Sequence, residues 1–214
     1  MLVPSADDPG LEKLLRVLNA THEPIYLDTE PEPNAQENDC FAIVDSKVSC
    51  FGGKRILGWQ IWKGSGFIEA ELHAVWESPG GDPKDITPKL IPLKHILFVE
   101  DEALAYDGRQ VNNVRLNTTK NKLVDDFIEV CNYYFFAQNK GKLAFFHGYL
   151  TAEIMGEDRF RNFLAIRELK TGIDKMLLKN ETRDSLCFCK SGRKFKNCHG
   201  EGLTTKLLTM INLT

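Results

Sequence analysis

The sequence has no long apolar run and no start typical of a secreted protein. Nowhere do eighteen consecutive apolar residues occur, and residues 1–10 contain no basic stretch followed by an apolar one. We therefore expect a cytoplasmic protein that has no membrane partner.

The sequence also has no excess of positive charge. It contains 27 basic and 30 acidic residues, which give a net charge of -3 and a pI near 6.0. Proteins that coat nucleic acid over their whole surface need clustered Lys and Arg, so this balance excludes such a role. The 43% hydrophobic and 27% charged fractions are ordinary for a globular protein. At 214 residues the chain is long enough for one substantial domain with a small appendage.

Cysteines are few and unevenly spread. Three of the six lie within residues 187–198, and the other three, Cys40, Cys50 and Cys131, are scattered. Without a secretory signal, this distribution favours metal ligands and free thiols over a disulfide framework.

Hydrophobic periodicity predicts an α+β fold. Helical spacing occurs at residues 11–19, 122–139 and 160–178, and in a helix that begins at Cys40, with Asn38 or Asp39 as its cap, and ends at Gly52. Alternating residues predict antiparallel strands within 56–87 and a further strand at 96–99. We expect an antiparallel sheet with packed helices over residues 1–180, and a small metal-bound segment over 181–214.

That small segment contains the pattern C-x-C-x8-C-H. Cys187, Cys189, Cys198 and His199 supply three thiolates and one imidazole, which saturate a tetrahedral zinc ion. Because no coordination position is left for a substrate, such a site is structural, and Zn²⁺ binding supplies folding energy. We expect Phe188 and Phe195 to shield the ion. The basic residues Arg193, Lys194 and Lys196 are expected to offset the negative charge of the thiolates.

At Cys187 to Gly200 the sequence resembles the SEC-C motif, which is known from the C-terminal tail of the SecA preprotein translocase motor. The resemblance includes the Ser191-Gly192 turn, the basic and aromatic positions and the final Cys198-His199-Gly200. It implies zinc binding and a protein partner, a chaperone or the ribosome. A local contact between the basic run 193–196 and RNA is an alternative use of those cations, although charge compensation is the simpler one.

A second candidate site combines Cys40, His73 and Asp85. Cys40 falls at the start of a predicted helix, where amide N–H groups and the helix dipole favour a thiolate. His73 lies on the more polar face of a predicted strand, and a chain reversal at Pro79-Gly80 would bring Asp85 opposite His73. Asp82 is a rival for the third position.

The order of these three residues is similar to that in papain-like and transglutaminase-like thiol enzymes, with a possible core at residues 36–100. The resemblance rests on the phrases Asp39-Cys40-Phe41, 71–76 and 84–88. It implies a cysteine hydrolase or acyl transferase. The other interpretation is that Cys40 is a buried small residue and that His73 and Asp85 have structural roles.

Two functions therefore stay open. In the first, the protein is an accessory factor whose zinc segment docks a cytosolic partner. In the second, His73 deprotonates Cys40, the thiolate attacks a carbonyl, and Asp85 holds the imidazolium.

Overall fold

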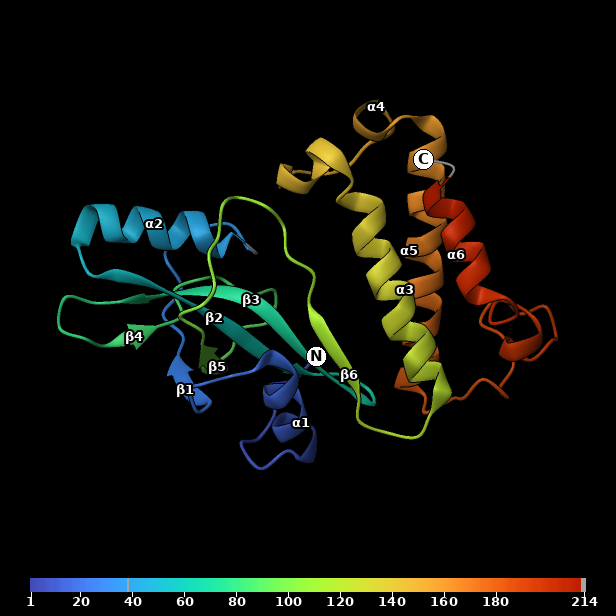
Figure 1. Cartoon of the computed structure of the whole chain (residues 1–214), viewed down its shortest axis with the longest axis horizontal. Coiled ribbons are helices and arrows are strands. Elements are labelled where there is room, and N and C mark those ends of the chain that lie inside the picture. Colours follow the sequence, from blue (N-terminus) through green and yellow to red (C-terminus); the bar gives the residue numbers. More distant parts are fainter. Residues whose placement is uncertain (38, 213–214) are drawn as a thin grey trace. The chain divides into compact units, whose positions relative to one another are not determined.

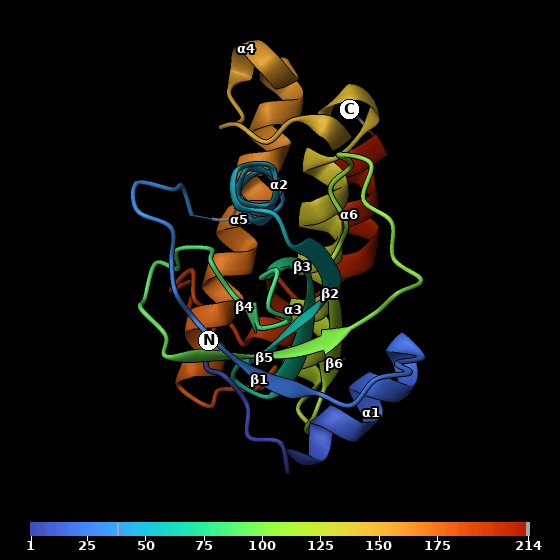
Figure 2. The same ribbon diagram turned by 90° about the vertical axis from the view of Figure 1, so that its left-hand side faces the viewer.

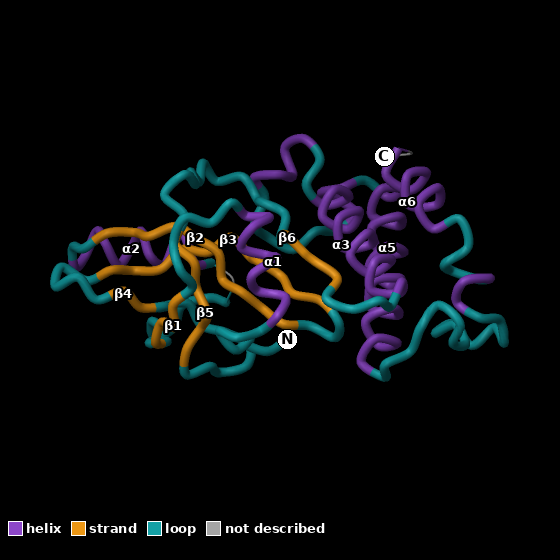
Figure 3. The backbone as a smooth tube through the Cα atoms, turned by 60° about the horizontal axis from the view of Figure 1, so that its bottom comes forward, coloured by secondary structure: helices purple, strands orange, loops and turns teal. Residues whose placement is uncertain are grey.

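The computed structural model describes residues 1–37 and 39–212, and the chain divides into two compact units. Unit 1 comprises Met1–Gly64, Ile68–Asp107 and Asn113–Leu116, and unit 2 comprises Ser65–Phe67, Gly108–Asn112 and Asn117–Thr214. Figure 3 shows that unit 1 is built mainly of strands and that unit 2 contains the long helices α3 and α5. The boundary predicted near residue 180 stays a prediction.

Unit 1 contains an antiparallel sheet whose strands differ in length. Its elements are α1 (Pro9–Leu18), β1 (Ile25–Asp28), α2 (Cys40–Phe51), β2 (Lys54–Lys63), β3 (Phe67–Glu77), β4 (Pro83–Lys84), β5 (His95–Glu100) and β6 (Val114–Asn117). The strand order is β1-β5-β2-β3-β4, and β6 also pairs with β3. The long strands β2 and β3 run antiparallel, from Lys54 opposite Glu77 to Lys63 opposite Ile68. Figure 1 shows this ladder as the centre of the sheet.

Two helices cover hydrophobic parts of this sheet. Leu11 and Leu14 of α1 join a buried cluster with Trp59 and Ile61 of β2. The Asp8 carboxylate caps α1 by accepting a hydrogen bond of 2.9 Å from the Gly10 N–H.

Helix α2, seen nearly end-on in Figure 2, packs through Cys40 and Val44 against Ala74. The helix begins at Cys40, as predicted, but Asp39 caps it only by position, because its side chain makes no capping hydrogen bond. Asn38, the other predicted cap, lies outside the described residues.

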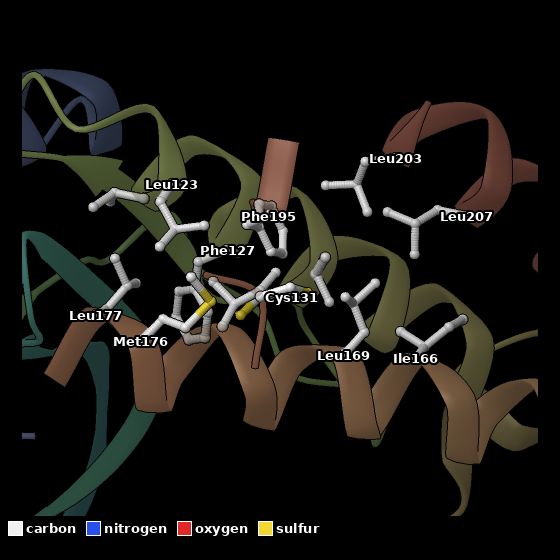
Figure 4. Packing of buried hydrophobic residues seen from close by; sticks show 14 of the residues in the cluster. Leu123, Phe127, Cys131, Ile166, Leu169, Met176, Leu177, Phe195, Leu203 and Leu207 are labelled. Carbon is white, nitrogen blue, oxygen red and sulfur yellow. The ribbon is translucent and has the colours of Figure 1, made fainter. Parts of the chain in front are cut away.

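Unit 2 is a helical domain. Its elements are α3 (Lys122–Gln138), the 3-10 helix η1 (Gly141–Phe145), α4 (Ala152–Met155), α5 (Glu157–Leu178), the 3-10 helix η2 (Phe195–Asn197) and α6 (Leu203–Asn212). The core lies where α3, α5 and α6 meet, and Figure 4 shows Phe127, Ile166 and Leu207 pointing into it. The segment between α5 and α6 contributes Cys187, Phe195 and Cys198 to the same core. The predicted α+β fold, with an antiparallel sheet and packed helices, is confirmed.

Within residues 1–37 and 39–212, no helix is both long enough and apolar enough to cross a membrane.

Candidate metal centre and candidate thiol site

The four predicted metal ligands lie in a tight reversal of the chain between α5 and α6. The Cys187 N–H donates to the Arg193 carbonyl at 2.9 Å, and the Phe195 N–H donates to the Ser185 carbonyl at 2.9 Å. The turn between them needs left-handed backbone at Lys190, with φ 59°, and at Gly192, with φ 77°. This reversal brings the pair Cys187 and Cys189 opposite the pair that follows η2.

The donor atoms of Cys187, Cys189, Cys198 and His199 all lie within 4.8 Å of one another. Cys187 Sγ lies 3.2 Å from His199 Nδ1, Cys198 Sγ lies 3.5 Å from the same nitrogen, and Cys189 Sγ lies 3.6 Å from Cys198 Sγ. A tetrahedral zinc ion with Zn–S of about 2.3 Å and Zn–N of about 2.0–2.1 Å has ligand–ligand edges of about 3.5–3.8 Å. The donor set and its spacing therefore fit zinc, with His199 binding through Nδ1.

The surroundings of Cys189 Sγ favour the thiolate form of this ligand. Hydrogen bonds from the Ser191 hydroxyl and backbone lower the pKa of Cys189 to about 6. Burial raises the pKa of Cys187, which stands deeper in unit 2. A bound divalent cation would hold such a thiol in its deprotonated form.

The basic residues of the segment divide into two groups. Arg193 Nη2 donates to Cys198 Sγ at 3.4 Å, as the charge-compensation argument expected. Lys194 and Lys196 instead pair with the Asp184 carboxylate, at 3.5 and 2.6 Å. A direct contact with a ligand sulfur is thus shown for Arg193, whereas the expectation that the two lysines offset the thiolate charge stays a prediction.

Aromatic rings pack closely on the ligand cluster. The Phe188 ring lies 4.6 Å from the His199 ring, and Phe195 is fully buried. A Cβ at Gly172 of α5 would come 2.6 Å from the Phe188 ring, and one at Gly200 would come 2.5 Å from the Phe195 ring. The two glycines therefore permit the close packing that holds both aromatic residues.

Arg183 fastens the segment to α3, and sequence reasoning did not identify it. Its Nε forms an ion pair of 3.0 Å with Asp126 Oδ2, and its Nη2 donates to the Gly200 carbonyl at 2.9 Å. Burial raises the pKa of Asp126 to about 6, and Arg183 acts against that rise. The two residues are far apart in sequence, so no local pattern signals their contact.

In unit 1 the structure brings His73 and Asp85 together. His73 Nε2 lies 2.9 Å from Asp85 Oδ1, and both side chains are buried. The pairing of Trp76 with Lys84 between β3 and β4 sets this contact. Asp82, the rival third residue, instead forms an ion pair of 3.3 Å with Lys84.

Cys40 is placed near this pair but is not bonded to it. Cys40 begins α2, is only 6% exposed, and packs against Ala74 and Ile86. Among the described interactions, none is a hydrogen bond between Cys40 Sγ and the His73 ring. Cys40 nevertheless acts on His73 electrostatically: burial disfavours the imidazolium, but the charges of Cys40 and Asp85 outweigh it and raise the pKa of His73 to about 9.

Lys89 is a member of this cluster that sequence reasoning missed. Its Nζ forms an ion pair of 2.9 Å with Asp85 Oδ2 and lies 3.4 Å from His73 Nε2. Burial opposes the charge of Asp85, yet His73 and Lys89 together lower the pKa of Asp85 to about 2. The only sequence signal was the spacing of four residues between Asp85 and Lys89.

Comparison with known protein families identifies a short motif in unit 2. The family model for the SEC-C motif matches residues 185–201, which contain all four metal ligands. No curated protein and no solved structure matches the chain. The chain thus carries a SEC-C motif with a Cys₃His cluster suited to a metal ion, and this match covers only a short part of unit 2.

Proposed function

We propose that this is a zinc-binding accessory protein whose SEC-C segment docks a cytosolic partner. The observation that supports zinc binding most strongly is the meeting of four donor atoms within 4.8 Å, three sulfurs and one nitrogen, inside a matched SEC-C motif. This set leaves no open coordination position, so the ion has a structural and not a chemical role. Its role is to give the segment a fixed shape.

The docking role rests on what that fixed shape presents to solvent. Residues 189–194, which form the turn over the metal cluster, are exposed, while Cys187, Phe195 and Cys198 anchor the turn from beneath. A turn held rigid by metal loses little conformational freedom when a partner binds. The resemblance to the SecA tail makes a chaperone or a ribosomal component the first class of partner to test.

Two cysteine variants test zinc binding. Elemental analysis of purified protein should give one zinc per chain, and Cys198→Ala should abolish it. Cys50→Ala is the matched control, because Cys50 is exposed and is not in the cluster, and it should keep the ion. A metal-free wild-type protein after purification without chelator would contradict the proposal. Capture of a chaperone or ribosomes by wild type but not by Cys198→Ala would support the docking role.

A second candidate function is that of a thiol hydrolase or acyl transferase in unit 1. The buried contact of 2.9 Å between His73 and Asp85, with Cys40 at the start of α2, favours it. Because Nε2 of His73 faces Asp85, Nδ1 is the atom that would take the proton of Cys40. The thiolate would attack a carbonyl carbon and expel the leaving group, which accepts a proton from His73. Water or an amine would then release the acyl group and regenerate the thiol.

Alkylation of Cys40 separates the two functions. A thiolate held by His73 should react with iodoacetamide faster than glutathione does at neutral pH, and His73→Gln should remove this advantage. If a cell that carries Cys40→Ala in place of the wild-type protein shows the same defect as a cell without the protein, and the variant retains zinc, the result would favour the enzyme hypothesis. Loss only in Cys198→Ala, with Cys40→Ala unaffected, would favour the accessory role.

A further inference from the structure

The two units carry opposite charge, which the overall value of -3 conceals. Unit 2 contains 17 basic and 11 acidic residues, whereas unit 1 contains 10 basic and 19 acidic residues. Three thiolates and one divalent zinc ion would together remove only one positive charge from unit 2. Unit 2 is therefore the part of the chain suited to a polyanionic partner.

A short segment of unit 2 also exposes several aromatic rings. Between the end of α3 and the residues after η1, Phe136 is 54% exposed, Phe145 is 54% exposed and Tyr149 is 95% exposed. Exposed aromatic rings are unfavourable in water. Single exposed rings are ordinary on protein surfaces, whereas several within a short segment are typical of a binding surface.

The same segment contains no acidic residue. From residue 130 to residue 152 the sequence contains no Asp or Glu, while the exposed residues Lys140 and Lys142 lie between the aromatic positions. Carboxylates within this stretch would repel a phosphate, so their absence from it favours an anionic partner.

Hydrogen bonds within unit 2 hold the segment in place. The Gln110 N–H donates to the Ala144 carbonyl at 2.8 Å, and His147 Nε2 donates to the Gly108 carbonyl at 2.9 Å. Residues 141–145 form the 3-10 helix η1, so Phe145 lies at the end of an ordered turn and Tyr149 follows it by four positions. The segment is drawn in yellow after α3 in Figure 1.

We propose that residues 136–149 bind a single-stranded nucleic acid, with bases stacked on Phe136, Phe145 and Tyr149 and phosphates at Lys140 and Lys142. Stacking suits any base because every base has a π-face, and nearby cations follow the phosphate backbone. An acidic protein would also be attracted to the lysines, and the experiment below distinguishes it from a nucleic acid. A duplex hides its base faces and fits this surface less well.

The test is fluorescence anisotropy of the zinc-loaded full chain with a labelled oligouridine of about 16 nucleotides. Tyr149→Ala and Phe145→Ala should each weaken binding at least about fivefold, because one stacked base contributes about 1–3 kcal/mol. Phe51→Ala is the matched control, since Phe51 is 63% exposed but belongs to acidic unit 1, and it should leave affinity unchanged. Binding should also weaken when salt is raised from about 50 to about 200 mM.

Three results would overturn the proposal. The first is no binding of oligouridine by wild type. The second is equal affinity for a duplex of the same length, which would exclude stacking on unpaired bases as the mode of binding. The third is full affinity in both aromatic variants together with displacement by polyglutamate, which would indicate an acidic protein partner instead. Circular dichroism spectra of the variants, whose changed side chains are exposed, verify that they remain folded.

Discussion

Removal of the metal should unfold the end of unit 2 and not merely loosen one turn. Phe195, Leu203 and Leu207 are 0%, 4% and 0% exposed, and all three belong to the segment that the ligands hold together. Full burial of each such side chain contributes about 1.5–3 kcal/mol, so about 5–9 kcal/mol of apolar stabilisation depends on the segment keeping its fold. A whole domain has a net stability of about 5–15 kcal/mol, so the loss is of the same order.

Hydrogen exchange followed by mass spectrometry measures this loss directly. In protein treated with a strong chelator, and in Cys198→Ser, amides of α6 (Leu203–Asn212) should exchange at least a hundredfold faster than in the zinc-loaded protein. Amides of β2 and β3 in unit 1 should be unchanged and serve as the internal control. Protection of α6 that persists without metal would refute the reasoning, because packing alone would then suffice.

Three further predictions concern the buried charges. The pKa of His73 is raised from 6.5 to about 9, so protonated His73 stabilises the folded protein fully below pH 6.5, and this stabilisation is lost as pH rises through about 9. Denaturant unfolding at several pH values should show the corresponding fall in the free energy of unfolding in wild type but not in His73→Gln. Lys89→Met should raise the pKa of His73 further, since the Lys89 charge lowers it; NMR titration of the ring would contradict us by showing a fall. Arg183→Met should lower the free energy of unfolding by about 1–2 kcal/mol at neutral pH, a value that is reduced because Arg183 is partly exposed. This loss should shrink as pH falls through about 6, because Asp126 then becomes neutral. An unfolding midpoint equal to that of wild type at neutral pH would refute the prediction.

The meeting of the four candidate metal ligands was predictable because its signal is local. Cys187, Cys189, Cys198 and His199 lie within thirteen positions, and the chemistry of three sulfurs and one nitrogen depends on few other residues. The antiparallel strands β2 and β3 were likewise visible from the alternation of apolar and polar residues, although Glu69 and His73 on the polar face of β3 are buried too.

The contacts that surround both sites were not predictable in this way. Arg183 meets Asp126 only because α3 packs beside the SEC-C segment. The choice of Asp85 over Asp82 beside His73 depends on the register of the short strand β4, which the sequence does not specify.

The contacts that hold the SEC-C segment have a consequence for protein engineering. The Phe188 ring lies against Gly172, and Arg183 reaches Asp126, so groups outside residues 185–201 complete its support. A graft of the matched stretch onto another scaffold would carry the four ligands but would lose the contacts with Gly172 and Asp126. A transplant that keeps its shape would need the facing surfaces of α3 and α5 as well.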